Sequence, residues 1–314
     1  MDANSLCARS GMLSSRLLRR AHALRLRDTL SSTPRSPRVA TRLTWDCRCA
    51  HASTPRASEA SQTPPTLSIA TPVTGHRHML RALRSVQQQD VAVGRLQHLV
   101  FVDGPRPGVA QQIRSLELRH PVHVVELPYA VGTDGWLGHR MYGAACFLNS
   151  SDYLMYFDED NVLDADHVSS VLRAMEAAGL PSWGHSLRKI YDPSSGEFVC
   201  IDAVDSLGTL GPTRHDPPRR FVDTNCMVVR RDVAPLVASG WYNRRKGADS
   251  AVSADLCARF SDGICTNRFT VSYVAASSSD SNGLAHFTQP EPLAAVIALA
   301  EAGPPLNTAP LDDC

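Results

Sequence analysis

The sequence predicts an α/β fold, with a mostly parallel β-sheet covered by helices on both faces and a mixed second half. From residue 67 onward, apolar runs rich in β-branched and aromatic residues alternate with helix-length segments, a pattern typical of a sheet buried on both sides. The chain has 314 residues, of which 43% are hydrophobic, enough to bury the core of such a domain. No stretch reaches the roughly 18 consecutive apolar residues of a membrane span, so no transmembrane segment is expected.

The first 66 residues are expected to be a disordered extension outside this fold. Residues 1–60 contain 11 of the 32 basic residues and 4 of the 31 acidic ones, a net charge of +7, which leaves −6 for the rest. An arginine-rich, acid-poor segment without a secretory apolar core is typical of a transit peptide to a plastid or mitochondrion. An untargeted, disordered extension of a cytoplasmic protein explains the segment equally well. Lysine occurs only twice in the whole chain, so the abundance of arginine can be a general compositional bias rather than a targeting signal. The acidic body argues against nucleic acid as a partner.

The first half contains four strand-like runs, at residues 67–71, 99–102, 122–127 and 153–157. The first run ends at Pro72 and the second at Asp103-Gly104, because proline and Asp-Gly pairs interrupt strands. Apolar residues at helical spacing predict helices between the runs, at residues 76–89, 111–119 and 138–148.

The second half is less regular. Strand-like runs occupy residues 198–204, 221–230 and 269–275, and helices are predicted at 232–239 and 249–260. We therefore expect one functional domain over residues 67–288. Residues 289–314 are expected to form a C-terminal helix and tail, and this helix is expected to pack on the body because it has no basic face.

Acidic residues cluster where the predicted strands end. Asp103 follows the second strand, and Asp158, Glu159 and Asp160 follow the fourth. In open parallel sheets, ligands bind beyond the carboxyl ends of the strands. Asp158 and Asp160 project to the same side, and two hard oxygen ligands suit Mg²⁺ or Mn²⁺ carrying a diphosphate. The alternative is a solvated turn that caps the next helix, but capping needs one acid and Asp164 is available for it.

From residue 67 to about 287, the chain resembles a family 2 glycosyltransferase of the GT-A fold. Thr71-Pro72, Asp103-Gly104 and the D-x-D motif within FDEDN at 157–161 occur in the family's order. Three further blocks are similar to a poorly characterised bacterial-type subgroup: WLGHR at 136–140, SLRKI at 186–190 and VDTNC at 222–226. The resemblance implies a Rossmann-like sheet and metal-dependent transfer of a sugar, with inversion, from a nucleotide-sugar donor to a hydroxyl of a glycan, lipid or protein acceptor.

The resemblance also implies a donor site and a metal site. Thr71 and Asp103 are expected to contact the nucleotide base and ribose. Asp158 and Asp160 are expected to bracket Mn²⁺ or Mg²⁺, with Asp158 also contacting the nucleotide sugar. His286 is a candidate third metal ligand.

Two residues between the third and fourth strands are expected beside the donor. His139 and Arg140 stand where the family carries polar and basic residues, and a guanidinium there can pair with phosphate or a carboxylate. The alternatives are a partly buried helix-cap histidine and a helix-surface arginine.

Inversion requires a carboxylate that takes the proton of the acceptor hydroxyl. In the family this acid begins a helix after the strand that carries the VDTNC-like block, and Asp249 occupies that place; a helix N-cap is the equally weighted alternative. Asp223 is the second candidate, followed by Asp202 and Asp205. The chain departs from the family pattern at Ser250, where an arginine is common, and this bears on donor or acceptor detail rather than on reaction type.

Two other functions remain open from the sequence. A nucleotidyltransferase acting on sugar phosphates also uses an acid pair on an α/β sheet, but it usually has a Gly-rich basic loop after the first strand, which residues 72–77 do not resemble. A catalytically inactive family member would bind a glycan or a protein partner, and the intact Asp158 and Asp160 argue against it. The nine cysteines are too scattered for a disulfide scaffold.

Overall fold

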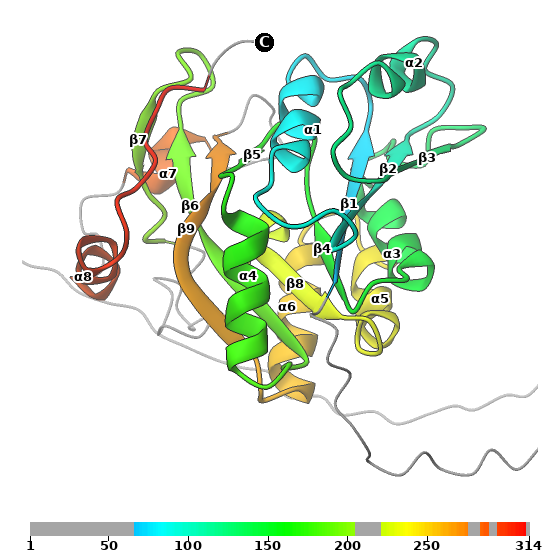
Figure 1. Cartoon of the computed structure of the whole chain (residues 1–314). Coiled ribbons are helices and arrows are strands. Elements are labelled where there is room, and N and C mark those ends of the chain that lie inside the picture. The colour runs from blue at the N-terminus through cyan, green and yellow to red at the C-terminus, as the bar shows by residue number, and fades with distance from the viewer. Residues whose placement is uncertain (1–65, 205–220, 276–282, 289–293, 312–314) are drawn as a thin grey trace, which may run out of the picture. The chain divides into compact units, whose positions relative to one another are not determined.

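The computed structural model describes residues 66–204, 221–275, 283–288 and 294–311, so the predictions for the N-terminal extension lie outside the described residues. A single mixed sheet has the strand order β3-β2-β1-β4-β8-β6-β9-β5, with β7 pairing to β6 (Figure 1). The strands are β1 (Leu67–Val73), β2 (Leu96–Val102), β3 (Val122–Glu126), β4 (Tyr153–Tyr156), β5 (Val162–Leu163), β6 (Trp183–Tyr191), β7 (Phe198–Ile201), β8 (Met227–Arg230) and β9 (Ile264–Val274). The predicted α/β fold class is confirmed.

Helices cover both faces of this sheet, with α1 and α4 on one face and α3, α5 and α6 on the other (Figure 1). None of the described helices is both long and apolar enough to cross a membrane. The helices are α1 (Met79–Gln87), α2 (Val109–Arg114), α3 (His139–Leu148), α4 (His167–Ala177), α5 (Ala234–Tyr242), α6 (Ala248–Arg259), α7 (Leu284–Phe287) and α8 (Ala294–Ala302).

The first four strands in chain order form the parallel part of the sheet. β2 pairs with β1 and β3, and β1 pairs with β4, all in parallel register. The carboxyl ends of these strands therefore meet at one edge, where ligands bind in open α/β sheets. Asp103 directly follows β2, and Asp158 follows β4 after Phe157, so the fold brings both acids to this edge.

The second half joins the sheet through antiparallel pairing. β8 lies between β4 and β6 and is antiparallel to both, whereas β6 and β9 are parallel. The predicted strand at 221–230 is shorter than expected, because only Met227–Arg230 is extended. A 3₁₀ turn at Thr224–Cys226 precedes it, and the Asp223 side chain caps this turn by accepting the N–H of Asn225.

Strand β6 is not predicted from the sequence, because it does not form an apolar run. Its centre holds Arg188 and Lys189, and both side chains are buried. Arg188 pairs with Asp202 and Asp223, and Lys189 pairs with Asp164. Buried charges are tolerated when they are paired. The acids that pair with Arg188 and Lys189 lie outside β6, so the strand has no local pattern that would predict it.

The C-terminal helix packs on the body. Ala300 and Leu306 lie against a small apolar cluster that contains Leu187 of β6 and Phe269 of β9. The carbonyl oxygen of Asn307 accepts a hydrogen bond from the ammonium of Lys189 at 2.6 Å. These contacts join the last described segment to the two central strands of the second half.

Candidate active site

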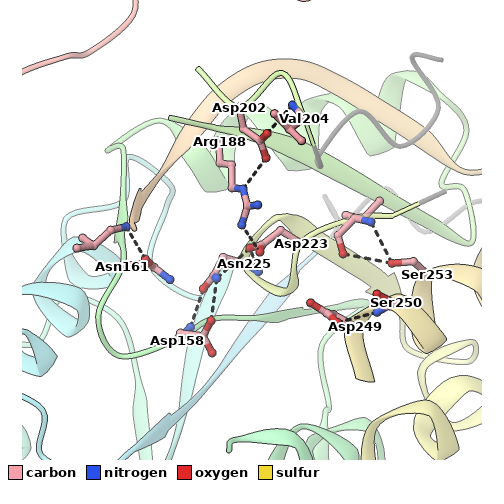
Figure 2. Close-up of polar contacts among 12 residues, drawn as sticks. Asp158, Asn161, Arg188, Asp202, Val204, Asp223, Asn225, Asp249, Ser250 and Ser253 are labelled. Carbon is pink, nitrogen blue, oxygen red and sulfur yellow. Dashed lines mark hydrogen bonds and ion pairs between the residues drawn. The ribbon is translucent and has the colours of Figure 1, made fainter. Parts of the chain in front are cut away.

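Asp158 is held at the end of β4 by three hydrogen bonds from two residues. The Tyr142 hydroxyl donates to Oδ1 of Asp158 at 2.6 Å, and Nδ2 of Asn225 donates to Oδ2 at 2.8 Å. The backbone N–H of Asp158 donates to Oδ1 of Asn225 at 2.7 Å (Figure 2). Since both carboxylate oxygens and the backbone are engaged, the position of Asp158 is fixed by α3 on one side and the turn before β8 on the other.

A buried chain of polar groups continues from Asn225 to β6. Nδ2 of Asn225 also donates to Oδ1 of Asp223 at 3.0 Å, and the other oxygen of Asp223 pairs with the Arg188 guanidinium (Figure 2). Nε of Arg188 donates to Asp202 at 2.8 Å. Asp202 is fully buried and Asp223 nearly so, and the carboxylates of both are paired with Arg188.

Two further acids near this chain, Asp160 and Asp249, form no ion pair with any residue that the structure describes. Burial and the negative charge of Asp158 raise the pKa of Asp160 to about 7. Burial and the negative charge of Asp223 raise the pKa of Asp249 to about 7, although the backbone N–H of Ser250 donates to its Oδ1 at 2.7 Å. Asp249 lies at the first turn of α6, and its carboxylate points towards the side where Asp158 lies (Figure 2).

This surplus of negative charge fits a divalent cation. The charges of Asp158 and Asp223 add to burial in raising the pKa values of the neighbouring acids Asp160 and Asp249, and Arg188 balances only part of this charge. Carboxylate oxygens are the ligands that Mg²⁺ and Mn²⁺ prefer, and a bound cation would favour the charged carboxylates that burial and mutual repulsion disfavour. Asp160 is the most available ligand, because no other side chain hydrogen-bonds to its carboxylate in the part of the chain that the structure describes.

The predicted metal site of Asp158, Asp160 and His286 is not formed in the structure. Among the described residues, no three His, Cys, Asp or Glu side chains come close enough together to hold a metal ion. His286 lies in the short helix α7, with its ring against Phe287, and is not grouped with Asp158 and Asp160. A metal at this edge would therefore use the two aspartates and oxygen atoms of the ligand itself.

Thr71 and Asp103 both hydrogen-bond to other parts of the fold. Thr71 is fully buried in β1 and its hydroxyl hydrogen-bonds the ring of His98 at 2.8 Å, so its side chain does not reach the site surface. Asp103 accepts the backbone N–H groups of Val131 at 2.6 Å and Gly132 at 3.1 Å. A Cβ on Gly132 would lie 2.7 Å from Oδ2 of Asp103, which explains why glycine stands there. Asp103 thus shapes the loop between β3 and α3.

His139 and Arg140 start α3 beside that loop. His139 is buried, its Nδ1 lies 3.2 Å from the carbonyl oxygen of Arg244, and burial lowers its pKa. The exposed Arg140 donates to the carbonyl oxygen of Val131 at 3.3 Å, and its guanidinium lies 3.9 Å from the centre of the Trp136 ring. Arg140 therefore presents its remaining donors outward, whereas His139 ties two loops together.

Three residues of this site were not found by sequence reasoning. Tyr142 and Asn225 position Asp158, and the only signal for Asn225 was its place in the VDTNC block. Glu159, the middle acid of the D-x-D motif, accepts the N–H groups of Thr74 and His76 at 2.7 and 3.0 Å and so fixes the loop after β1. A motif read as a metal site thus also carries a structural acid. Asp205, a minor base candidate, lies outside the described residues.

No family model matches the chain, and no curated protein matches it. Among solved structures, S. aureus TarS 1-349 in complex with UDP aligns with a TM-score of 0.53 at 10% identity, over 67% of this chain and 61% of that one. Its complex with UDP-GlcNAc aligns equally well, over 68% and 60%. This similarity shows the GT-A fold. The chain spans about six tenths of the TarS fragment, and at 10% identity the likeness is one of fold.

Proposed function

We propose that the protein is a metal-dependent glycosyltransferase that moves a sugar from a nucleotide-sugar donor to an acceptor hydroxyl. The observation that carries this proposal is the group of Asp158, Asp160 and Asp249 at the carboxyl edge of a GT-A sheet. Two of these acids, Asp160 and Asp249, have pKa values raised to about 7, as expected where carboxylates are collected for chemistry. TarS, which shares the fold, binds UDP and UDP-GlcNAc.

The donor would lie over the ends of β1, β2 and β4. Asp158 and Asp160 would hold Mn²⁺ or Mg²⁺, and the ion, when bound, stabilises the charge of the departing nucleoside diphosphate as a Lewis acid. Asp103 would hold the 131–132 loop beside the nucleoside, and Arg140 would face the phosphates. Thr71 has no role in this arrangement, because it is buried.

Asp249 is the better candidate for the catalytic base. Its carboxylate forms no ion pair with a described residue, and a pKa of about 7 is close to the value at which a base works best near neutral pH. Asp223 is bound to Arg188 and would lose that ion pair on protonation. In the proposed step, the acceptor oxygen bonds to the anomeric carbon while the bond to the diphosphate breaks. The hydroxyl proton passes to Asp249 and the nucleoside diphosphate leaves, with inversion.

A thermal-stability screen tests this function without knowledge of the acceptor. UDP, GDP, UDP-GlcNAc and other nucleotide sugars would be added to the folded protein with and without MnCl₂. A ligand at 100 times its Kd stabilises by about 2.7 kcal/mol, which raises the Tm of a domain of this size by roughly 5 °C or more. We expect such a shift for at least one nucleotide sugar, and only with the metal. A folded protein that no nucleotide stabilises would contradict the proposal.

A further inference from the structure

The loop between α5 and α6 carries a run of cations just before the candidate base. Residues 243–247 connect the two helices and include Arg244, Arg245 and Lys246, all exposed. Gly247 turns the chain in the left-handed region, with φ of 68°, and α6 begins at the next residue. Asp249 lies in the first turn of α6, so this basic loop leads directly to the carboxylate proposed to meet the acceptor hydroxyl.

Contacts with the loop before α3 hold the basic loop in place. The carbonyl oxygen of Arg244 hydrogen-bonds the ring of His139 at 3.2 Å. The guanidinium of Arg245 lies 5.9 Å from the centre of the Trp136 ring, which Arg140 approaches at 3.9 Å. The Trp136 ring therefore lies near two guanidinium groups, that of Arg140 at the start of α3 and that of Arg245 in the basic loop. Cation–π contacts of this kind stabilise each cation.

Most arginines that the structure places near acids pair with them, as Arg188, Arg230 and Arg268 do. Arg244 and Arg245, by contrast, form no ion pair with a carboxylate of any described residue. Cations held close together repel one another, and an anion that binds between them relieves this repulsion.

We propose that the acceptor carries a phosphate or carboxylate near the hydroxyl that receives the sugar, and that Arg244 and Arg245 bind this anion. The inference rests on the proposed function, which gives the site its acceptor side. The donor diphosphate does not need these two arginines. In the proposed function its charge is balanced by a divalent cation at Asp158 and Asp160 and by the guanidinium of Arg140. Arg244 and Arg245 lie in the loop that leads into α6, five and four residues before Asp249, and this continuity with the base is the reason for assigning them to the acceptor.

A direct binding experiment tests the acceptor class. The probes are glucose, glucose 6-phosphate and glucuronate, which share a sugar ring and differ in charge, titrated onto the full chain in the presence of UDP and MnCl₂. We expect the charged sugars to bind about tenfold or more tightly than glucose, in a salt-dependent way. In the Arg244→Gln/Arg245→Gln double variant this preference should disappear, while UDP affinity stays within about twofold of the wild type. Arg173→Gln, an exposed arginine of α4, is the matched control and should keep the preference.

Each other outcome has a separate meaning. Equal binding of charged and neutral sugars by the wild type would overturn the proposal, as would a preference that the double variant retains. If the double variant lost UDP affinity instead, the two arginines would serve the donor diphosphate and the acceptor assignment would be wrong. Failure of UDP to bind with MnCl₂ would count against the proposed function itself, and the sugar titrations without UDP would still report on the anion site.

Discussion

Asn225 hydrogen-bonds to Asp158 through both polar atoms of its side-chain amide: Oδ1 accepts the Asp158 backbone N–H at 2.7 Å, and Nδ2 donates to the Asp158 carboxylate at 2.8 Å (Figure 2). The same Nδ2 also donates to Asp223. Asn225 is fully buried, so water does not replace these bonds if the amide is lost. One buried amide thus connects the D-x-D motif after β4 with the turn that begins β8.

Loss of this amide should weaken both the fold and the binding of metal and nucleotide. We expect Asn225→Ala to lower the free energy of unfolding by about 2–3 kcal/mol, because buried polar groups of Asp158 and Asp223 lose their partner. Affinity for UDP with MnCl₂, measured by calorimetry on the folded variant, should fall about tenfold as Asp158 becomes mobile.

Asn149→Ala is the matched control, because the Asn149 amide makes a similar pair of bonds with Ser151, away from the acids. This control should lose stability but keep UDP affinity. Equal affinity losses in the two variants would mean that Asn225 acts only through general stability.

The crowded carboxylates predict a particular dependence of stability on pH. The folded-state pKa of Asp160 is raised from 3.8 to about 7, so the folded protein loses stability relative to the unfolded chain as the pH rises from about 4 through 7. Without metal, Asp160→Asn should therefore have a higher Tm than the wild type at pH 8, and the difference should vanish near pH 4. A variant less stable than the wild type at pH 8 would show that Asp160 is compensated within the fold.

Alanine substitution should affect the stability of the protein differently at Asp223 and at Asp249. Asp223→Ala leaves the buried Arg188 with one acid in place of two, and removal of one partner from a buried ion pair destabilises by about 3–5 kcal/mol. Asp249→Ala removes a carboxylate whose charged form is disfavoured by burial, so at about pH 7.5 the variant should be at least as stable as the wild type. Denaturant unfolding of both variants checks the contrast, and a large loss for Asp249→Ala would make that residue structural.

A base at Asp249 also predicts a kinetic signature. Asp249→Asn should keep donor affinity but lower kcat by roughly 10²-fold or more, because the variant binds the sugar nucleotide and has no group to take the proton. Wild-type turnover should fall as the pH drops below about 7, where Asp249 becomes protonated, and the variant should lose this dependence. Donor hydrolysis to water provides the assay until an acceptor is known, and near-normal turnover of the variant would assign the base elsewhere.

Local patterns predicted the parallel half of the fold well, because each strand there is an apolar run ended by a turn residue, as Pro72 and Asp103-Gly104 illustrate. They missed β6, since its central Arg188 and Lys189 are neutralised by acids far away in sequence. The acids at the strand ends could also be predicted, because topology alone brings Asp103 and Asp158 to one edge.

The role of each acid depends on hydrogen bonds and ion pairs that the spacing of residues in the sequence does not predict. Glu159 lies between two proposed ligands yet binds backbone N–H groups, and Asp223 and Asp249 look equivalent until Arg188 is seen to pair with only one of them. The burial of Thr71 likewise follows from packing against His98 rather than from its position at the end of a strand.

The central claim is that Asp158 and Asp160 bind a nucleoside diphosphate through a divalent metal. Isothermal titration of UDP and GDP into the wild type and Asp160→Asn, each with MnCl₂ and with EDTA, tests it most directly. We predict tight binding of at least one nucleotide to the wild type with MnCl₂, and a loss of about 10²-fold or more both with EDTA and in the variant. Wild-type affinity that is the same with and without metal, or a variant that binds as tightly as the wild type, would contradict the account.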